Sequence, residues 1–250
     1  MKQTAVQIKI CGLTRPEDCQ AVNESKPDYA GFVFAPSRRQ VTPQLAGQLI
    51  RQLDSSIRPV GVFTETGISE ICTIVRETGL QVIQLHGAAE PGRIAGLRHC
   101  LAGIPEAAAA LPAIWQRLAV PLDQPAARSL KEARRTIARF MKQKMADDLP
   151  DAWLLDSCRP GQSGGTGESF DWSVFKDFCR EHPVILAGGL NIGNVEKALK
   201  QLNPMVVDCS SGVEFENRKD PARIASFCAI IHDYNQTLGT GRPAYPAKEE

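Results

Sequence analysis

Short apolar segments alternate with amphipathic segments along this whole chain, and that alternation constrains the fold more than any other feature. The apolar segments have the length of β-strands, and each is followed by a stretch with helical periodicity. Strict strand–helix alternation predicts a parallel sheet, and eight repeats favour closure into a (β/α)8 TIM barrel of the α/β class. The expected strands cover residues 7–11, 28–34, 58–63, 81–86, 113–120, 152–156, 183–187 and 205–209, and the expected helices cover residues 16–23, 43–53, 69–78, 92–100, 129–145, 172–180, 192–202 and 221–234.

The length of the chain fits such a barrel as a single domain. A barrel of this kind typically needs about 250 residues, and the chain has 250 residues. An open, doubly wound sheet is the competing architecture, but no glycine-rich fingerprint follows the first expected strand. We expect the barrel over residues 1–236, a flexible tail over residues 237–250, and an irregular insertion over residues 97–112, which contain two prolines and an alanine run.

Composition excludes several classes of function. The net charge of +1 argues against a nucleic-acid-binding surface, and no apolar run approaches the length of a membrane span. The N-terminal residues contain no apolar signal-peptide core, so we expect a cytoplasmic protein. The eight cysteines contain no C-x-x-C pair and the four histidines are dispersed, which predicts free thiols and no metal site.

Two consecutive strand ends run into small residues. The seventh expected strand leads into Gly188 and Gly189, and the eighth leads into Ser210, Ser211 and Gly212. Small residues let backbone N–H groups approach an anion, and a phosphate site often follows the last two strands of a barrel. The sequence therefore predicts a phosphate site here, with tight turns as the structural alternative.

Side-chain alternation along the strands predicts which groups face the barrel interior. Residues two apart on a strand share a face, so Lys9 and Cys11 point inward if the intervening isoleucines face the helices. The same rule turns Asp156 and Asp208 inward. A thiol and two carboxylates then meet at the carboxyl ends of the strands, where catalytic groups of barrel enzymes lie.

Other polar residues at this rim have functional and structural interpretations. Gln84 and His86 share a face of the fourth expected strand, although His86 alone is also compatible with a strand cap. Arg38 and Arg39 follow the second strand, where one guanidinium is suited to grip a carboxylate, with a solvated pair as the alternative. Residues 164–167 form a further glycine-rich loop that suits either a mobile rim loop or a phosphate ligand.

Eight short motifs in order give the chain a family resemblance. The chain resembles phosphoribosylanthranilate isomerase of tryptophan biosynthesis over residues 7–232. The motifs are Lys9-Ile10-Cys11-Gly12, Gly31-Phe32-Val33-Phe34, Val60-Gly61-Val62-Phe63, Gln84-Leu85-His86-Gly87, Leu154-Leu155-Asp156, Gly164-Gly165-Thr166-Gly167 with Phe170-Asp171-Trp172, Ala187-Gly188-Gly189-Leu190, and Asp208-Cys209-Ser210-Ser211-Gly212-Val213-Glu214.

The resemblance implies an Amadori rearrangement, in which N-(5-phosphoribosyl)anthranilate becomes 1-(2-carboxyphenylamino)-1-deoxyribulose 5-phosphate without a cofactor or metal. By position, Cys11 is the general base and Asp156 the general acid. Arg39 is the best match for the arginine that contacts the anthranilate carboxylate, and Arg38 is the alternative. The glycines and serines after the last two strands then bind the phosphate.

Supporting roles follow for the remaining residues of the site. Gln84, His86 and Asp208 are expected to bind substrate, and Asp208 either orients sugar hydroxyls or pairs with Lys9. A thiol acts as a base only as thiolate, so the pKa of Cys11 has to fall towards neutrality, and we expect Lys9 to help. The expected partner is a small phosphosugar substrate, and the expected assembly is a monomer or homodimer.

Two other functions are compatible with parts of the sequence. One is a relaxed-specificity isomerase that also accepts the related aminoaldose of histidine biosynthesis; such barrels usually carry an aspartate base on the first strand, which Cys11 disfavours. The other is a non-catalytic phosphosugar-binding barrel. Cys11 and Asp156 across from a phosphate site argue against that second function.

Overall fold

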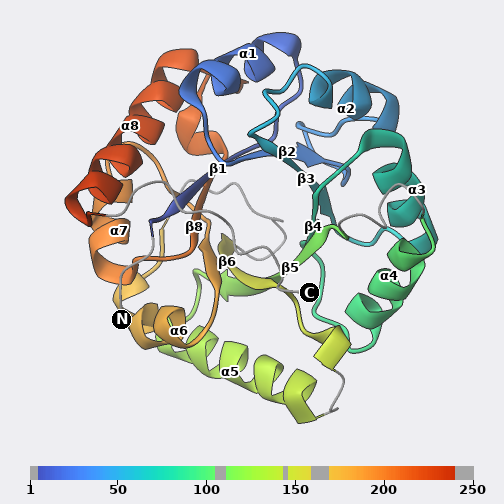
Figure 1. Cartoon of the computed structure of the whole chain (residues 1–250). Coiled ribbons are helices and arrows are strands. Elements are labelled where there is room, and N and C mark those ends of the chain that lie inside the picture. The colour runs from blue at the N-terminus through green and yellow to red at the C-terminus, as the bar shows by residue number, and fades with distance from the viewer. Residues whose placement is uncertain (1–4, 105–110, 143–145, 159–168, 240–250) are drawn as a thin grey trace.

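A computed structural model of the chain describes residues 5–104, 111–142, 146–158 and 169–239. In it, eight parallel strands close into a barrel in the order of the sequence, and the last strand pairs with the first (Figure 1). The fold is therefore the predicted (β/α)8 barrel. Its strands are β1 (Gln7–Cys11), β2 (Tyr29–Val33), β3 (Arg58–Phe63), β4 (Val82–Leu85), β5 (Ala113–Pro121), β6 (Ala152–Cys158), β7 (Val184–Leu186) and β8 (Val206–Cys209).

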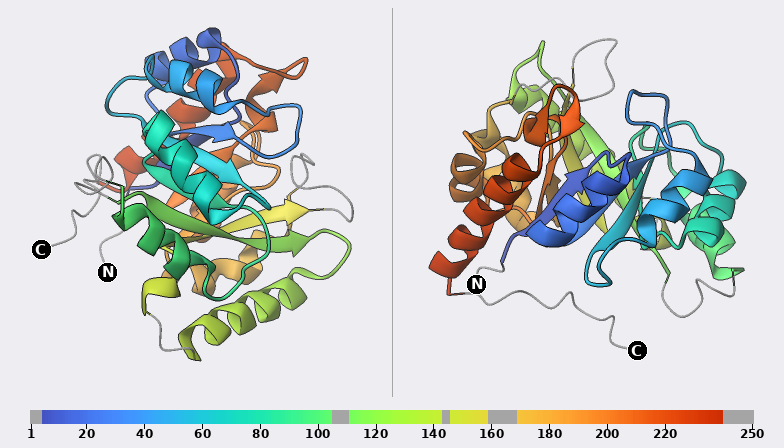
Figure 2. Two further views of the ribbon diagram at one scale, coloured as in Figure 1. Left: turned by 90° about the vertical axis from the view of Figure 1, so that its right-hand side faces the viewer. Right: turned by 90° about the horizontal axis from the view of Figure 1, so that it is seen from above.

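Helices form the outer layer around the barrel, and the loops that follow the strands gather at one rim (Figure 2). None of these helices, within the described ranges, is long and apolar enough to cross a bilayer. The helices are α1 (Pro16–Ser25), α2 (Pro43–Ile50), α3 (Ile68–Thr78), α4 (Arg93–Ala102), α5 (Ala126–Lys142), α6 (Lys176–Glu181), α7 (Val195–Leu202) and α8 (Pro221–Thr237), with short 3-10 helices η2 (Ala146–Asp148), η3 (Trp172–Phe175) and η4 (Ser211–Val213).

The barrel interior is filled below the rim. One residue or two from most strands form an inner apolar cluster, in which the rings of Tyr29 and Trp115 meet edge to face at 4.9 Å. Residues that alternate with the inward-facing positions of the strands pack outward against the helices. Ile8 and Ile10, on either side of the inward-facing Lys9, are examples. This filling leaves only the carboxyl ends of the strands open to a ligand, as expected for a barrel of eight strands.

Some element boundaries differ from the prediction. Helix α4 continues to Ala102, so residues 97–102 are helical and not part of an irregular insertion. The reason is that Leu97 and Leu101, four residues apart, are both fully buried on one face of the helix. Residues 105–110 of the expected insertion, the loop 164–167 and residues 240–250 of the expected tail lie outside the described residues.

A small hairpin sits between β8 and α8. Its strands β9 (Glu214–Phe215) and β10 (Arg218–Lys219) are antiparallel and place Glu214 opposite Lys219. The turn residues Glu216 and Asn217 have positive φ angles of 48° and 64°. This hairpin brings Glu214 and Lys219 to the rim beside the ends of β1 and β2.

The two ends of the described chain are joined by one side chain. Asn235 of α8 accepts a hydrogen bond from the backbone N–H of Val6 and donates one to its carbonyl, both at 2.8 Å. This amide pair fixes the start of β1 against the last helix.

Candidate active site

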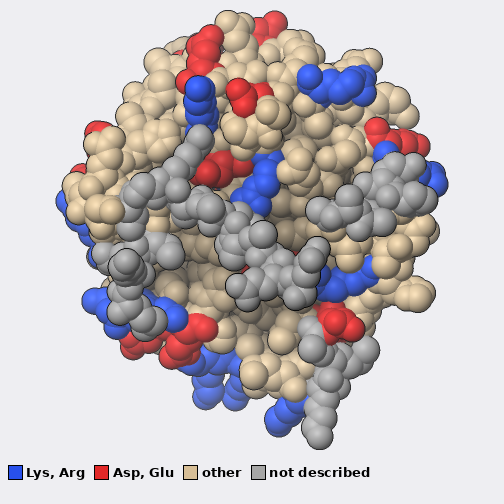
Figure 3. Space-filling model, in the orientation of Figure 1, with Lys and Arg blue, Asp and Glu red and all other residues tan. Residues whose placement is uncertain are grey.

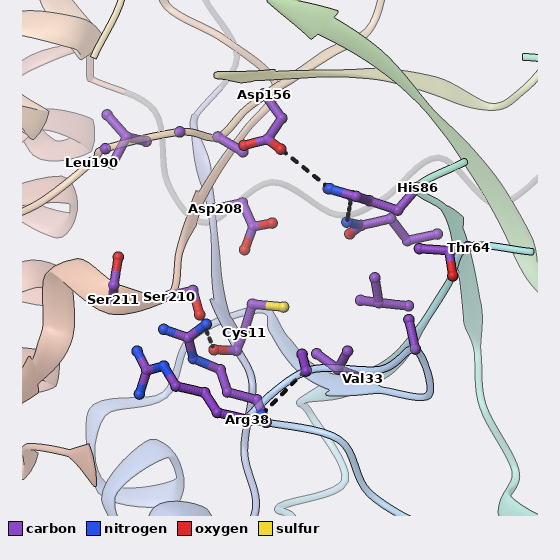
Figure 4. A pocket seen from close by; sticks show the side chains of 18 of the residues that line it. Cys11, Val33, Arg38, Thr64, His86, Asp156, Leu190, Asp208, Ser210 and Ser211 are labelled. Atoms are coloured by element: carbon purple, nitrogen blue, oxygen red, sulfur yellow. Dashed lines mark hydrogen bonds and ion pairs between the residues drawn. The ribbon is translucent and has the colours of Figure 1, made fainter. Parts of the chain in front are cut away.

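A cavity of about 350 Å³ opens among the carboxyl ends of the strands. On this face, basic and acidic side chains lie next to each other near the centre (Figure 3). Cys11, Asp156 and Asp208 surround one space in the close view (Figure 4). The cavity is lined by Cys11, Val33, Ala35, Pro36, Ser37, Arg38, Arg39, Val62, Thr64, Gln84, His86, Asp156, Ala187, Gly188, Gly189, Leu190, Asp208, Ser210 and Ser211.

Strands β1 and β8 build one wall of this cavity. Lys9 and Asp208 are directly opposite each other in the β1–β8 register, and Lys9 Nζ donates to Asp208 Oδ2 at 2.8 Å. Lys9 is fully buried. The structure thus shows the ion pair that was one of the two expectations for Asp208. The other carboxylate oxygen, Oδ1, is buried and has no partner among the described residues, so it remains available to a ligand hydroxyl.

The protonation state of this wall differs from the expectation. Burial raises the pKa of the Cys11 thiol, the charge of Asp208 raises it further, and Lys9 lowers it. The effect of Lys9 has the expected sign, but burial outweighs it, so the pKa of Cys11 lies above its ordinary value. Burial also lowers the pKa of Lys9, but the charge of Asp208 and the hydrogen bond to it act in the opposite direction; the pKa lies above its ordinary value, so Lys9 is a cation. Because its own pKa is raised, Cys11 is a neutral thiol at neutral pH.

The opposite wall carries Asp156 with two nitrogen-bearing neighbours. His86 Nε2 and Arg117 Nε each lie 3.2 Å from Asp156 Oδ2. These are ion-pair distances, but neither the Asp156 oxygen nor Arg117 Nε is aligned for a hydrogen bond within the described structure. Both contacts use Oδ2, so neither of these two neighbours engages Oδ1 of Asp156.

The orientation of His86 follows from its other neighbour. Gln84 Nε2 lies 3.4 Å from His86 Nδ1. An amide nitrogen only donates, so in this orientation Nδ1 is the acceptor and Nε2 faces Asp156. The same orientation leaves Gln84 Oε1 buried without a partner among the described residues.

Arg117 was missed in the sequence analysis, although a signal was present. Trp115 of β5 belongs to the inner apolar cluster, and Arg117 lies two residues further on the same face. The alternation rule that placed Cys11 and Asp156 therefore also places Arg117 in the barrel mouth.

The glycines predicted to bind phosphate are also required by close packing. Gly188 and Gly189 have φ angles of 83° and 68°, and a Cβ at Gly188 would lie 2.5 Å from the backbone nitrogen of Ser157. A Cβ at Gly212 would lie 1.9 Å from the carbonyl oxygen of Leu190. Gly212 does not line the cavity, so its direct effect is to let the two rim loops meet.

Two serines from the eighth strand end complete the predicted phosphate side. Ser210 and Ser211 both line the cavity together with Gly188 and Gly189. The hydroxyl of Ser210 donates to the carbonyl of Cys11 at 2.9 Å, which ties this loop to the end of β1. The predicted phosphate loops and the thiol therefore share one wall.

The two arginines after β2 converge on a buried carboxylate. Arg39 donates to Glu214 through Nε at 2.7 Å and through Nη2 at 3.0 Å, and Arg38 donates through its own Nη2. Burial raises the pKa of Glu214, but the hydrogen bonds from Arg39, Lys219 and Arg38 outweigh it and lower the pKa from 4.5 to about 2. Arg39 is the more buried arginine, with 15% of its side chain exposed against 42% for Arg38. Glu214 and Lys219 were not among the predicted site residues.

A metal does not fit the described acidic groups. No group of three or more potential metal-ligating side chains occurs in the described parts of the chain. Asp156, Asp208 and Glu214 are each paired with a basic side chain. Each of these carboxylates therefore already has a cationic partner in the described structure.

Comparison with known proteins points to one family. The family model described as N-(5'phosphoribosyl)anthranilate (PRA) isomerase matches residues 8–106 and 117–229. The N-(5'-phosphoribosyl)anthranilate isomerase of Acetivibrio thermocellus is 39% identical over 227 residues, 90% of this chain and 95% of the relative. That of Thermoanaerobacter sp. (strain X514) is 36% identical over 222 residues, 89% of this chain and 96% of the relative.

Solved structures agree with the sequence relatives. Phosphoribosyl anthranilate isomerase from Thermotoga maritima superposes with a TM-score of 0.72 at 31% identity, over 91% of this chain and 99% of the other. A phosphoribosyl anthranilate isomerase in complex with reduced 1-(o-carboxyphenylamino)-1-deoxyribulose 5-phosphate gives a TM-score of 0.67 at 28% identity, over the same shares of the two chains. On the family match, these identities and this coverage, the chain belongs to the N-(5'-phosphoribosyl)anthranilate isomerase family of tryptophan biosynthesis.

Proposed function

We propose that this chain catalyses the Amadori rearrangement of N-(5-phosphoribosyl)anthranilate with Asp156 as general acid and Cys11 as general base. The observation that carries the proposal is the position of these two groups on opposite walls of one cavity, with the glycine and serine loops beside them. The solved relative that holds a reduced product analogue supports the choice of substrate.

The first step is opening of the ribose ring. Asp156, in its acid form, donates a proton to the furanose oxygen while the bond from that oxygen to C1′ breaks. The lone pair of the anthranilate nitrogen forms the C=N bond, which gives a cationic Schiff base. His86 faces the other oxygen of the same carboxyl group, so it is placed to return a proton to Asp156 after the step.

The second step is removal of the proton at C2′. The cationic Schiff base next to Cys11 stabilises a negative charge there, so we infer that the thiol ionises when this cation forms. Its proton passes to solvent, and solvent in turn resupplies the proton that Asp156 regains through His86. The Cys11 thiolate takes the C2′ proton, and the electron pair neutralises the iminium to give an enolamine. Its enol then tautomerises to the ketone of the product. Oxidation of C2′ to the ketone is balanced by reduction of C1′ within the same molecule, so the reaction needs no external oxidant or reductant.

The remaining residues orient the substrate. The phosphate lies against Gly188, Gly189, Ser210 and Ser211, where backbone N–H groups and hydroxyls serve as donors. Oδ1 of Asp208 accepts a sugar hydroxyl. Arg39 binds the anthranilate carboxylate, and the aromatic ring rests on the apolar rim residues of β2 and β3, which are Val33, Ala35 and Val62.

An isomerase assay on purified variants tests the proposal. Cys11→Ala and Asp156→Asn are each expected to lower kcat by roughly 10²–10⁴, the usual contribution of a positioned acid or base. Cys228→Ala is the matched control, because this buried cysteine of α8 is remote from the cavity lining. Turnover near the wild-type rate in either test variant would remove that residue from its role.

Growth of a tryptophan auxotroph lacking this step provides a second readout. The wild-type gene should restore growth and the Cys11→Ala gene should not. A wild-type protein without isomerase activity on this substrate would overturn the proposal. A parallel assay with the related aminoaldose of histidine biosynthesis tests for relaxed specificity.

A further inference from the structure

Glu214 is a buried carboxylate that no step of the reaction uses. Only 6% of its side chain is exposed, yet it accepts hydrogen bonds from three basic residues, which are Arg38, Arg39 and Lys219. Placing a carboxylate among three cations leaves this part of the mouth with a net charge of about +2. Such an arrangement fits a site for an anionic group, because the carboxylate orders the cations without neutralising them.

Arg39 is held in one orientation by two contacts. Glu214 takes the edge of the guanidinium formed by Nε and Nη2. The aliphatic stem lies on Gly12, where an added Cβ would come within 2.3 Å of Arg39 Cδ. Among the described residues nothing bonds to Nη1, so the outer edge of the guanidinium remains available at the cavity. A planar guanidinium fixed in this way offers its remaining donors in one direction.

Lys219 extends the same network to the phosphate side. Its Nζ donates to Glu214 Oε1 and to the carbonyl of Ser210, both at 2.9 Å. Glu214 therefore touches the arginine on one side and, through Lys219, the serine loop on the other. It touches neither the thiol nor the acid.

We propose that Glu214 is a positioning residue that fixes Arg39 for recognition of the aromatic carboxylate of the substrate. The inference rests on the proposed function and deepens it, because it assigns selectivity for carboxylate-bearing substrates to a residue outside the cavity lining. Removing the negative charge at position 214 frees the guanidinium to rotate. It therefore weakens binding of the carboxylate more than binding of the rest of the molecule.

Binding of two stable ligands tests this assignment. One is the reduced product analogue, and the other is the same molecule without the ring carboxylate; calorimetry gives both dissociation constants. The ratio of the two constants isolates recognition of the carboxylate. Any effect on the phosphate loop through Lys219 appears equally in both ligands and cancels.

The expected result is a selective loss. Glu214→Gln should reduce the preference for the carboxylated ligand by roughly tenfold, the effect of a disturbed charged hydrogen bond, and should change the other ligand's Kd by less than about threefold. In the isomerase assay KM should rise and kcat should change little. Glu181→Gln is the matched control, since Glu181 pairs with Arg134 in the same two-pronged way on the exposed surface.

A double variant shows whether the effect passes through Arg39. In an Arg39→Ala background, Glu214→Gln should cause no further loss of preference. If Glu214→Gln does not fold, Glu214→Asp keeps the charge but shortens the reach, and it should lower the preference in the same direction.

Three outcomes would overturn the inference. These are equal weakening of both ligands, no change in the preference, or a further loss in the Arg39→Ala background. A wild-type protein that binds neither ligand would instead refute the proposed function, and the inference with it.

Discussion

The two walls of the active site differ in how completely their polar groups are satisfied. On the β1–β8 wall, the bonds of Lys9, Ser210 and Lys219 fall between 2.8 and 2.9 Å, and Asp208 Oδ1 is the one atom of these groups that is buried without a partner in the described structure. On the β4–β6 wall, the contacts of Asp156, His86 and Gln84 fall between 3.2 and 3.4 Å, and several of their atoms lack an aligned partner in the described structure.

This difference indicates that the two walls respond differently when a ligand binds. The first wall is already ordered around the thiol and the predicted phosphate loops, so it needs little rearrangement when a ligand binds. The second wall holds groups whose hydrogen-bonding capacity is unused without a ligand. Buried polar atoms without partners are costly, and a substrate that satisfies them recovers that energy. We therefore expect stability effects to concentrate on the first wall, whereas catalytic effects arise on both walls, from Cys11 on the first and from Asp156 on the second.

The largest stability effect is expected from Lys9→Met. This substitution leaves Asp208 buried without its cation, which typically costs about 3–5 kcal/mol. Urea unfolding of the variant should show a loss in this range. The double variant Lys9→Met with Asp208→Asn should recover much of it, because no charge is then left unpaired. A loss below about 1 kcal/mol for the single variant would show that the ordered wall does not depend on this pair.

An intermediate stability effect is expected when the pH is lowered. Folding lowers the pKa of Glu214 from 4.5 to about 2. Its stabilising contribution is therefore fully present above pH 4.5 and is lost as the pH falls towards 2. Between pH 5 and pH 2.5 the wild type should lose about 2 kcal/mol more unfolding free energy than Glu214→Gln. If the unfolding free energies of the two proteins changed in parallel with pH, Glu214 would not be stabilised as a carboxylate by its three cationic neighbours.

The smallest stability effect is expected from Arg117→Gln on the second wall. Its contact with Asp156 is not aligned for a hydrogen bond, so unfolding free energy should change by less than about 1 kcal/mol. kcat should nevertheless fall, since a guanidinium beside the proposed acid is removed. Arg98→Gln, which breaks a pair with Asp151 away from the cavity, is the control. A large stability loss together with an unchanged kcat would contradict the expected difference between the two walls.

The sequence alone predicted the barrel and the inward direction of the side chains on β1 and β6, because both depend on local periodicity. Alternation along β1 and β6 was enough to place Lys9, Cys11 and Asp156, and the same rule reaches Arg117. The end of α4 was misplaced because the prolines and alanines that follow it obscured the buried spacing of Leu97 and Leu101.

Glu214 was not predictable in the same way. Its partners come from the β2 loop and from β10, and they meet only because a hairpin with two positive-φ residues turns back at the rim. Nothing in the local sequence specifies contacts between positions 175 or 176 residues apart. The direction of the pKa shift of Cys11 was also not predictable from the sequence, because it depends on how completely the closed barrel excludes water.

The Asn235 bonds to Val6 have a consequence for how the protein is made. Strand β1 leaves the ribosome before the other strands of the barrel, yet Asn235 lies 229 positions after Val6, and Asp208, the counter-ion of Lys9, lies 199 positions after Lys9. A buried ammonium group cannot settle into the barrel before its counter-ion has been synthesised. The nascent chain must therefore carry an unpaired edge strand through nearly all of translation, and Lys9 and Cys11 reach their final surroundings only when β8 pairs with β1.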